Sequence, residues 1–257
     1  MNLVTGASGL LGSHVVEKLI AMGEPVRALV RPSSDTRLLD QWGVEKVPGD
    51  ITDPQSLVEA MKGVQRVYHV AAQVGDWGPW ERFVAVTIEG TGNMLGAARR
   101  AKIKRFLHVS SISAYGHPDG EAMVLDESAP LGVNLHRWSY YSRAKVEAEK
   151  LVWQAHNKGD VPVTVVKPSW LYGPRDRASM PRLIRAIRAG KARLIGDGTN
   201  RLNLTYAGNE AEGCILAATN PKALGEAYNL AGDGEITQRQ YINKIAERLG
   251  CPPVTGK

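Results

Sequence analysis

Short apolar runs alternate with amphipathic stretches through the first two thirds of the chain. Runs with the length and composition of buried strands lie at residues 2–5, 25–30, 44–48, 66–70, 105–110 and 163–167. Between them, apolar side chains recur three and four positions apart, as in a helix with one buried face, at residues 54–61, 87–101 and 140–157. This alternation predicts an α/β fold, a Rossmann-type doubly wound parallel sheet with helices on both faces. Ligands of such sheets bind beyond the carboxyl ends of the strands.

A glycine-rich turn joins the first predicted strand to a helical pattern. It reads Gly6-Ala7-Ser8-Gly9-Leu10-Leu11-Gly12. Small residues let the backbone approach a pyrophosphate, and the first turn of the helix supplies free N–H groups. The spacing Gly-x-x-Gly-x-x-Gly differs from the Gly-x-Gly-x-x-Gly fingerprint, so a flexible loop is the alternative. The strand before the turn and the helix after it favour a dinucleotide site.

The choice between NAD and NADP depends on the residue that follows the second predicted strand. An Asp or Glu there would bind the NAD ribose, but the chain has Arg31, and no carboxylate occurs before Asp35. Arg31 offers a planar fork of donors suited to a ribose 2′-phosphate, with Ser33, Ser34 and Arg37 close in sequence. We therefore expect NADP to be favoured over NAD. An ordinary solvated arginine is the alternative interpretation.

Tyr141 and Lys145 are four residues apart in a predicted helix, so their side chains share one face. An ammonium beside a phenol favours the phenolate and lowers the pKa of the phenol from about 10. The pair predicts a proton donor or acceptor at Tyr141. Two exposed helix residues are the alternative, and the glycine-rich turn upstream is what favours chemistry. Glu147 and Glu149 of the same helix are interpreted as part of its solvated face.

The size and composition of the chain fit one cytoplasmic domain. Its 257 residues can bury a full core, and no repeat or linker divides them. A strand begins at residue 2, which leaves no room for a signal segment, and no apolar run reaches membrane-spanning length. Cys214, Cys251 and the six histidines show no metal-ligand spacing, so no metal site is predicted. His69 is interpreted as a packed, hydrogen-bonded imidazole.

The formal net charge of +6 suits attraction of an anionic cofactor, so no nucleic acid partner is needed to explain it. The densest basic stretch, residues 182–193, carries apolar residues at helical spacing. We expect a helix docked on the core with a charged outer face. Contact with a membrane would at most be peripheral.

Aromatic residues gather in three predicted loops at residues 73–82, 116–139 and 169–181. The residues in or beside these loops are Trp77, Trp80, Trp138, Tyr140, Trp170 and Tyr172. They predict either an apolar wall for a substrate or anchors that hold the loops on the core, and the sequence does not separate these two roles.

Several motifs together resemble the extended short-chain dehydrogenase/reductase family, part of the NAD-dependent epimerase/dehydratase superfamily, over nearly the whole chain. They are the glycine-rich turn, His69-Val70-Ala71-Ala72, Glu89-Gly90-Thr91 with Asn93, His108-Val109-Ser110-Ser111 through Tyr115-Gly116, and Tyr141 with Lys145. The resemblance implies a catalytic Ser-Tyr-Lys group of Ser111, Tyr141 and Lys145, with Ser110 as the alternative serine. The family usually has Asn where this chain has Thr87.

The strand ends and the resemblance together predict the cofactor site. Its residues are Gly6, Ser8, Gly9, Leu10, Leu11, Gly12, Arg31, Asp50, Ile51, Ala71, Ala72, Val109, Tyr141, Lys145, Pro168 and Leu171. Residues 1–257 form one domain in this reading, with 1–168 mainly binding the dinucleotide and 169–257 mainly the substrate. Relatives usually continue with further substrate-domain helices, so the chain is either truncated or naturally short. A homodimer is expected by analogy only.

Two positions favour the 3β-hydroxysteroid dehydrogenase and sterol-4-carboxylate 3-dehydrogenase branch over nucleotide-sugar enzymes. Sugar-nucleotide enzymes tend to have Asn where this chain has Trp170, and Arg where it has Leu202, with Arg201 one residue out of register. The resemblance implies an NAD(P)-dependent oxidoreductase that interconverts a secondary alcohol and a ketone on a bulky, apolar, sterol-like or terpenoid small molecule. The alternatives are a nucleotide-sugar epimerase or dehydratase and a non-enzymatic NADP-binding regulator.

Overall fold

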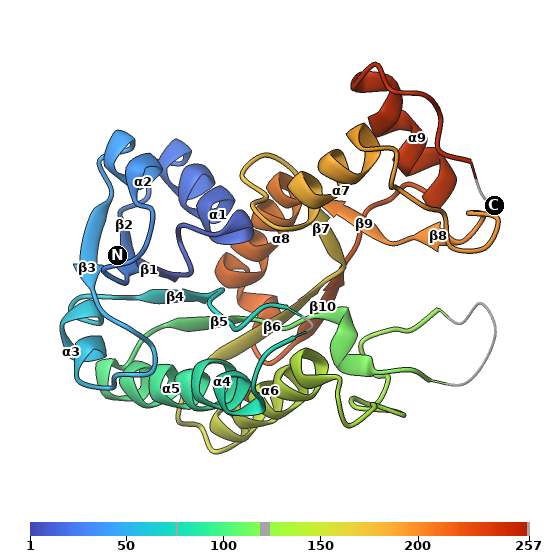
Figure 1. Ribbon diagram of the computed structural model, residues 1–257. Helices are drawn as coiled ribbons and strands as arrows, with labels where there is room; N and C mark the ends of the chain where they lie inside the picture. The colour runs from blue at the N-terminus through green and yellow to red at the C-terminus, as the bar shows by residue number, and fades with distance from the viewer. Residues whose placement is uncertain (76, 119–123, 256–257) are drawn as a thin grey trace.

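The computed structural model describes residues 1–75, 77–118 and 124–255, and its centre is a seven-stranded sheet (Figure 1). The order is β10-β6-β5-β4-β1-β2-β3, and every neighbouring pair runs parallel. The strands are β1 (Asn2–Thr5), β2 (Val26–Val30), β3 (Glu45–Pro48), β4 (Arg66–His69), β5 (Arg105–Val109), β6 (Val163–Pro168) and β10 (Ala227–Leu230). The predicted Rossmann-type fold is confirmed. Strand order reverses between β1 and β4, the point where such sheets bind ligands.

Helices cover both faces of this sheet (Figure 1). One face carries α1 (Leu10–Ala21), α2 (Arg37–Gln41) and α8 (Ala207–Thr219), and the other carries α3 (Ser56–Ala60), α5 (Gly90–Ala101) and α6 (Tyr140–Asn157). Each layer encloses its own apolar core, one including Val15, Leu107 and Ile215, the other including Leu57, Met94 and Val163. These paired cores explain why the strands read as continuous apolar runs.

The helix predicted at residues 87–101 is part of a longer helical segment. It starts with α4 (Trp80–Phe83) and passes through a π-helical turn, Val84–Glu89, into α5. Phe83 is fully buried and fixes the start of the segment to the core. The predicted loop 73–82 is therefore shorter than expected, and residue 76 in it lies outside the described residues, as do residues 119–123 of the second loop.

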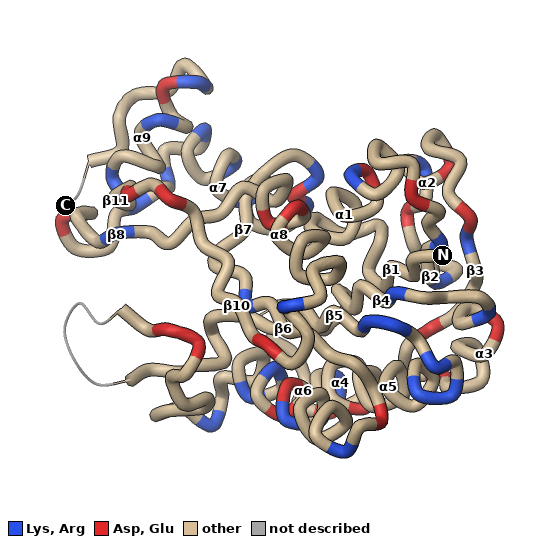
Figure 2. Tube along the Cα trace, turned by 180° about the vertical axis from the view of Figure 1, so that it is seen from behind, with Lys and Arg blue, Asp and Glu red and all other residues tan. Residues whose placement is uncertain are grey.

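A smaller lobe follows β6. Its strand pairs are β7 (Trp170–Tyr172) with β9 (Leu204–Tyr206), and β8 (Arg201–Leu202) with β11 (Ile236–Thr237). Helices α7 (Ser179–Arg188) and α9 (Gln238–Arg248) enclose a separate apolar cluster around Ile187 and Ile242. The basic stretch thus forms the expected helix, in which Arg182, Arg185 and Arg188 are exposed, and Figure 2 shows this helix beside α9. The helix packs on α9 rather than on the main core.

The chain does not stay in this lobe. Helix α8 returns to pack against α1, and after a short 3₁₀ turn (Pro221–Ala223) strand β10 pairs with β6. Residues 207–230 therefore belong to the main α/β unit, with α8 packed on the sheet and β10 paired in it, although they follow residue 168 in sequence. Among the described helices, none combines the length and the apolarity needed to cross a membrane.

Candidate active site

Close backbone packing makes the glycines of the turn at residues 6–12 necessary. Gly6 has a φ of +67°, and a Cβ there would lie 3.1 Å from the Ala71 nitrogen. A Cβ on Gly12 would lie 2.1 Å from the Gly6 carbonyl oxygen. Helix α1 begins at Leu10, and the residue before it, Gly9, has no side chain to cap the first turn. The turn and the open helix N-terminus fit a dinucleotide pyrophosphate.

A cavity of about 230 Å³ opens at this turn, where the strand order reverses. Eight of the predicted cofactor residues line it: Gly6, Ser8, Gly9, Arg31, Asp50, Ile51, Ala71 and Ala72. Leu10, Leu11 and Gly12 lie in the first turn of α1, and Val109, Pro168 and Leu171 lie in β5, β6 and β7, outside the lining of this cavity. Gln73 and Arg82 also line it. The cavity-lining position of Arg82 was not predicted, because the sequence pattern places this residue at the end of a loop.

The charges around Arg31 differ from a typical NAD ribose site. Arg31 lines the cavity together with Ser34, and no ion pair involving it occurs among the described residues. The nearest carboxylate in sequence, Asp35, receives two hydrogen bonds from the Arg37 guanidinium at 2.9 and 2.8 Å and lies 3.1 Å from Arg177. The hydrogen bonds from Arg37 hold the pKa of Asp35 well below its usual range. Arg37 is thus bound to Asp35 instead of helping Arg31.

His69 links the end of β1, just before the glycine-rich turn, to α5 through two hydrogen bonds. Its Nδ1 lies 3.0 Å from Thr5 Oγ1 and its Nε2 lies 3.0 Å from Thr91 Oγ1. Because the Thr91 hydroxyl donates to the Thr87 carbonyl, His69 must donate through Nε2 and accept from Thr5 through Nδ1. Burial lowers the pKa of His69 to about 3, so the ring is neutral. The predicted packed, hydrogen-bonded imidazole is confirmed.

Ser111, Tyr141 and Lys145 come together where β5 ends and α6 begins. Ser111 caps a 3₁₀ turn, Ile112–Tyr115, and its hydroxyl accepts hydrogen bonds from the nitrogen and the hydroxyl of Ser113 at 3.1 and 2.9 Å. It also hydrogen-bonds Tyr141. Lys145 Nζ donates to the Val109 carbonyl at 2.8 Å and lies 5.9 Å from the centre of the Tyr141 ring. The structure therefore brings the three predicted catalytic residues together.

One electrostatic expectation is wrong. Burial raises the pKa of Tyr141, and its hydrogen bond with Ser111 offsets this only in part. The phenolate loses water on burial, and the Lys145 ammonium contacts the ring side of Tyr141 while it bonds a backbone carbonyl. Lys145 is itself affected, because burial lowers its pKa to about 8. Tyr141 is therefore a protonated donor at neutral pH in this state.

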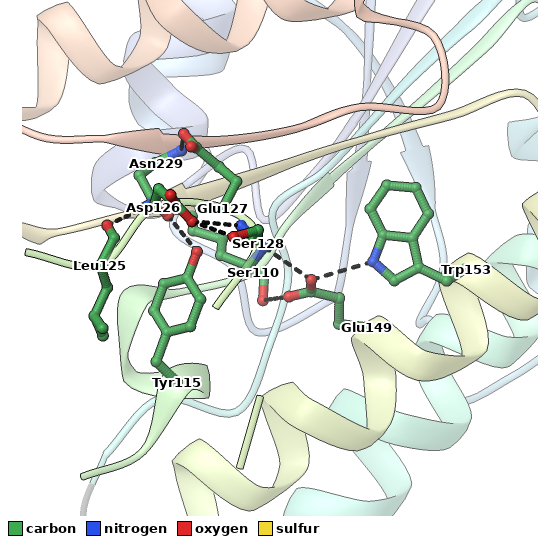
Figure 3. Close-up of polar contacts among 10 residues, drawn as sticks. Ser110, Tyr115, Leu125, Asp126, Glu127, Ser128, Glu149, Trp153 and Asn229 are labelled. Atoms are coloured by element: carbon green, nitrogen blue, oxygen red, sulfur yellow. Dashed lines mark hydrogen bonds and ion pairs between the residues drawn. The ribbon is translucent and has the colours of Figure 1, made fainter. Parts of the chain in front are cut away.

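The alternative serine, Ser110, bonds a different residue of α6. Its hydroxyl donates to Glu149 Oε2 at 2.6 Å, inside a buried cluster on α6 (Figure 3). Glu149 is only 1% exposed, so the interpretation of this residue as solvated is wrong, whereas Glu147 is exposed. Residue 149 follows Lys145 by one helical turn, and the face that buries Lys145 also buries Glu149.

Some of the aromatic residues anchor loops, and others line a second cavity. Trp80 and Tyr140 pack with ring centres 5.5 Å apart, and the Arg143 guanidinium lies 4.5 Å from the Trp80 ring centre, so these residues anchor loops on α6. Trp77 and Trp138 are exposed. A second cavity of about 390 Å³, between β7, α7 and α9, is lined by Trp170, Leu171, Tyr172, Asp176, Ser179, Met180, Arg182, Leu183, Arg193, Leu202, Gln238, Tyr241 and Ile242.

A family model described as the NAD dependent epimerase/dehydratase family matches residues 2–231. The chain belongs to this family. It is therefore an enzyme of a nicotinamide-dependent oxidoreductase type, as the motifs implied.

Several known proteins are similar to this family member. It is 38% identical to the sterol demethylase protein B of Methylococcus capsulatus, over 98% of this chain and 77% of the relative. It is 33% identical to the 4-hydroxy-2-methyl-3-oxo-4-farnesyl-3,4-dihydroquinoline-1-oxide ketoreductase of Stigmatella aurantiaca (98% and 74% covered). It is 30% identical to the decarboxylating sterol-4-alpha-carboxylate 3-dehydrogenase of Bos taurus (96% and 69% covered). The predicted branch is confirmed.

A solved structure supports the same fold and cofactor class. It is a short-chain dehydrogenase/reductase superfamily protein from Agrobacterium tumefaciens with bound NAD. This chain is 27% identical to it, with a TM-score of 0.82, and the match covers all of this chain and 85% of that one.

Proposed function

We propose that the protein interconverts a secondary alcohol and a ketone on a bulky, largely apolar molecule, sterol-like or terpenoid, with NADP preferred over NAD. The observation that carries the proposal is the lining of the second cavity. Trp170 and Leu202 lie in it at the two positions where sugar-nucleotide enzymes tend to have Asn and Arg. Arg201 instead pairs with Glu235 at 2.7 Å on the surface. A cavity with this lining favours an apolar ligand.

The catalytic roles follow from the contacts at the end of β5. The nicotinamide, when bound, donates or accepts a hydride at the substrate carbon. In reduction, the Tyr141 hydroxyl gives its proton to the substrate oxygen, and its raised pKa keeps that proton available at neutral pH. The Ser111 hydroxyl, which already bonds Tyr141, would hold the same oxygen. Lys145 places a positive charge beside Tyr141 and would stabilise the phenolate that remains.

The preference for NADP rests on the charges around Arg31. Among the described residues, Arg31 lines the first cavity and has no ion-pair partner, and Asp35 is paired with Arg37 and Arg177. A guanidinium in this position suits a ribose 2′-phosphate, and a charge-assisted contact of this type contributes roughly 1.5–3 kcal/mol. The unmodified protein should therefore bind NADPH more tightly than NADH in a fluorescence titration, and Arg31→Ala should remove most of that difference. Equal binding of both cofactors by the unmodified protein would contradict the assignment.

The apolar character of the substrate is also supported by the names of two relatives, a sterol demethylase protein and a ketoreductase of a farnesyl-bearing compound. The test is a panel of 3-ketosterols, terpenoid ketones, aryl ketones and nucleotide sugars, followed by nicotinamide absorbance. We expect net oxidation of NADPH with an apolar ketone. Tyr141→Phe should lower kcat at least ~100-fold while cofactor affinity stays nearly unchanged, because the lost hydroxyl acts in the transition state. Turnover within a few-fold of the unmodified protein would assign the proton to another group.

A nucleotide-sugar epimerase is the second candidate, because Arg182 and Arg193 line the same cavity and could bind a diphosphate. It predicts conversion of a nucleotide sugar with no net change in nicotinamide absorbance. Trp170→Asn separates the candidates: it should weaken apolar ligands without creating epimerase activity.

A further inference from the structure

A buried polar cluster lies beside the proposed catalytic residues. At its centre, Glu149 of α6 and Lys167 of β6 form an ion pair with 3.0 Å between Oε1 and Nζ, and their side chains are 1% and 2% exposed. Glu149 also accepts hydrogen bonds from Ser110 at 2.6 Å and from the Trp153 indole at 3.2 Å (Figure 3). The carboxylate thus has three partners. Nothing in the chemistry above requires the cluster itself.

Burying this pair has a large energetic cost. Two charges lose their hydration, and their attraction offsets that loss only when further hydrogen bonds satisfy the remaining polar atoms. An apolar pair of similar volume would often give equal or greater stability. The ion pair is therefore poorly explained by stability alone, and its position suggests another role.

The cluster is linked to Ser111, Tyr141 and Lys145 through both β5 and α6. Ser110, which Glu149 holds, directly precedes Ser111 in the chain. Glu149 lies one helical turn after Lys145, and its charge raises the pKa of Lys145 against the lowering caused by burial. On the far side, Lys167 Nζ lies 5.3 Å from the centre of the Tyr115 ring, in the 3₁₀ turn that Ser111 caps.

We propose that Glu149 and Lys167 are positioning residues for Ser111, Tyr141 and Lys145. The Glu149 carboxylate holds Ser110, which fixes the direction in which Ser111 leaves β5, and it gives Lys145 a negative neighbour that keeps it an ammonium. Lys167 holds the Glu149 carboxylate in place through the ion pair. The inference rests on the proposed function, because the residues that it serves are those assigned there.

The decisive variant replaces both charges at once. Glu149→Leu with Lys167→Met keeps the volume and leaves no unpaired charge, so its melting temperature should stay within a few degrees of the unmodified protein's. With the panel ketone that the unmodified protein reduces fastest, we expect kcat to fall roughly tenfold or more while KM changes little, because the cavity linings are untouched. The alkaline limb of the kcat profile should also move to lower pH, since Lys145 loses its anionic neighbour.

A matched control lies on the same helix. Glu147 and Lys150 form an exposed pair at 2.8 Å, with side chains 49% and 55% exposed. Glu147→Leu with Lys150→Met makes the same chemical change at the surface and should leave kcat and its pH profile unaltered. A folded Glu149→Leu, Lys167→Met protein with unchanged kcat and an unchanged pH profile would overturn the positioning role.

Two further measurements keep the outcomes separate. Tyr141→Phe is assayed in parallel: if it retains turnover, the proposed function fails, whereas if it alone loses turnover, only the positioning role fails. If the double variant does not fold, Ser110→Ala decides, because it cuts the link to Ser111 without removing a charge. It should lower kcat several-fold at an unchanged melting temperature, and an unchanged kcat would overturn the proposal.

Discussion

Two glutamates on opposite faces of the sheet are equally buried and differ in what surrounds them. Glu149 on α6 and Glu210 on α8 are each 1% exposed. Glu149 pairs with Lys167 and accepts two hydrogen bonds. Among the described residues, neither carboxylate oxygen of Glu210 has a hydrogen-bond partner. The carboxylate of Glu149 therefore has an ion-pair partner and two hydrogen-bond donors, whereas the described residues supply none to Glu210.

The consequence is a difference in protonation. Burial raises the pKa of Glu210 from its ordinary value of 4.5 to about 8, so it is largely neutral at pH 7 in the folded protein. A buried carboxylate accepts a charge only when partners replace the lost water. Glu149 has those partners and Glu210 does not, which makes Glu149 a candidate for function and Glu210 a cost to stability.

Removing the Glu149 carboxylate alone should have the largest effect on the free energy of unfolding. Glu149→Leu alone leaves the Lys167 ammonium buried without a counter-charge, so the free energy of unfolding should fall by about 3–5 kcal/mol. Urea unfolding followed by circular dichroism measures the loss. Glu147→Leu on the same helix, where the carboxylate is exposed, should change stability by less than about 0.5 kcal/mol. Similar values for the two variants would show that Lys167 finds another partner.

Removing the unsatisfied carboxylate should act in the opposite direction. Between pH 4.5 and about 8, the unfolded chain releases the Glu210 proton while the folded protein retains it. Stability from this residue is thus fully present below pH 4.5 and is lost as the pH rises to about 8. Glu210→Leu should therefore raise the free energy of unfolding at pH 8 by about 2–4 kcal/mol.

Its control is Glu212→Leu, two residues along α8, where the carboxylate is exposed and pairs with Lys18 at 3.0 Å. That variant should show neither the gain nor a change in pH dependence. Equal stability of Glu210→Leu and the unmodified protein at pH 8, measured by urea unfolding, would mean that Glu210 is satisfied in solution.

Two tyrosines repeat the contrast on a smaller scale. The Tyr115 hydroxyl donates to Asn229 at 2.8 Å (Figure 3), whereas the buried Tyr68 hydroxyl has no partner among the described residues. Tyr115→Phe should lower the free energy of unfolding by about 1 kcal/mol, and Tyr68→Phe should leave it unchanged or raise it. Thermal unfolding distinguishes the two, and a larger loss at Tyr68 would reverse the comparison.

The sheet and its ligand edge were predictable because their signals are local. Most of the parallel strands are short apolar runs, and Tyr140–Asn157 has the predicted bounds because its periodicity is strong. Strand β10 (Ala227–Leu230) was not predicted, and β3 (Glu45–Pro48) is largely exposed. Tertiary packing decided the rest. The short helix Trp80–Phe83 has too few residues to show a period, yet its last residue, Phe83, is fully buried.

The grouping of Ser111, Tyr141 and Lys145 was predictable from motifs, whereas its electrostatics were not. Spacing along a helix shows that Tyr141 and Lys145 share a face, but it gives neither the burial that raises the Tyr141 pKa nor the carbonyl that binds Lys145. The same four-residue spacing also connects Lys145 to Glu149 and could have shown that Glu149 is buried. Glu210 carries no such signal, because its burial comes from the packing of α8 against α1, β5 and β6, which are distant in sequence.

The return of the chain to the main sheet has an evolutionary consequence. Residues 169–206 leave the sheet after Pro168 and rejoin it at Ala207, the first residue of α8, with both ends held by the same folded body. A segment closed at both ends can be lengthened at small entropic expense. Mutations that change the shape of the cavity at Trp170 can therefore accumulate while the glycine-rich turn and the group of Ser111, Tyr141 and Lys145 stay unchanged. Under the proposed function, the substrate range can therefore change gradually through this insertion and through α9, which also lines the cavity, while the rest of the enzyme is kept.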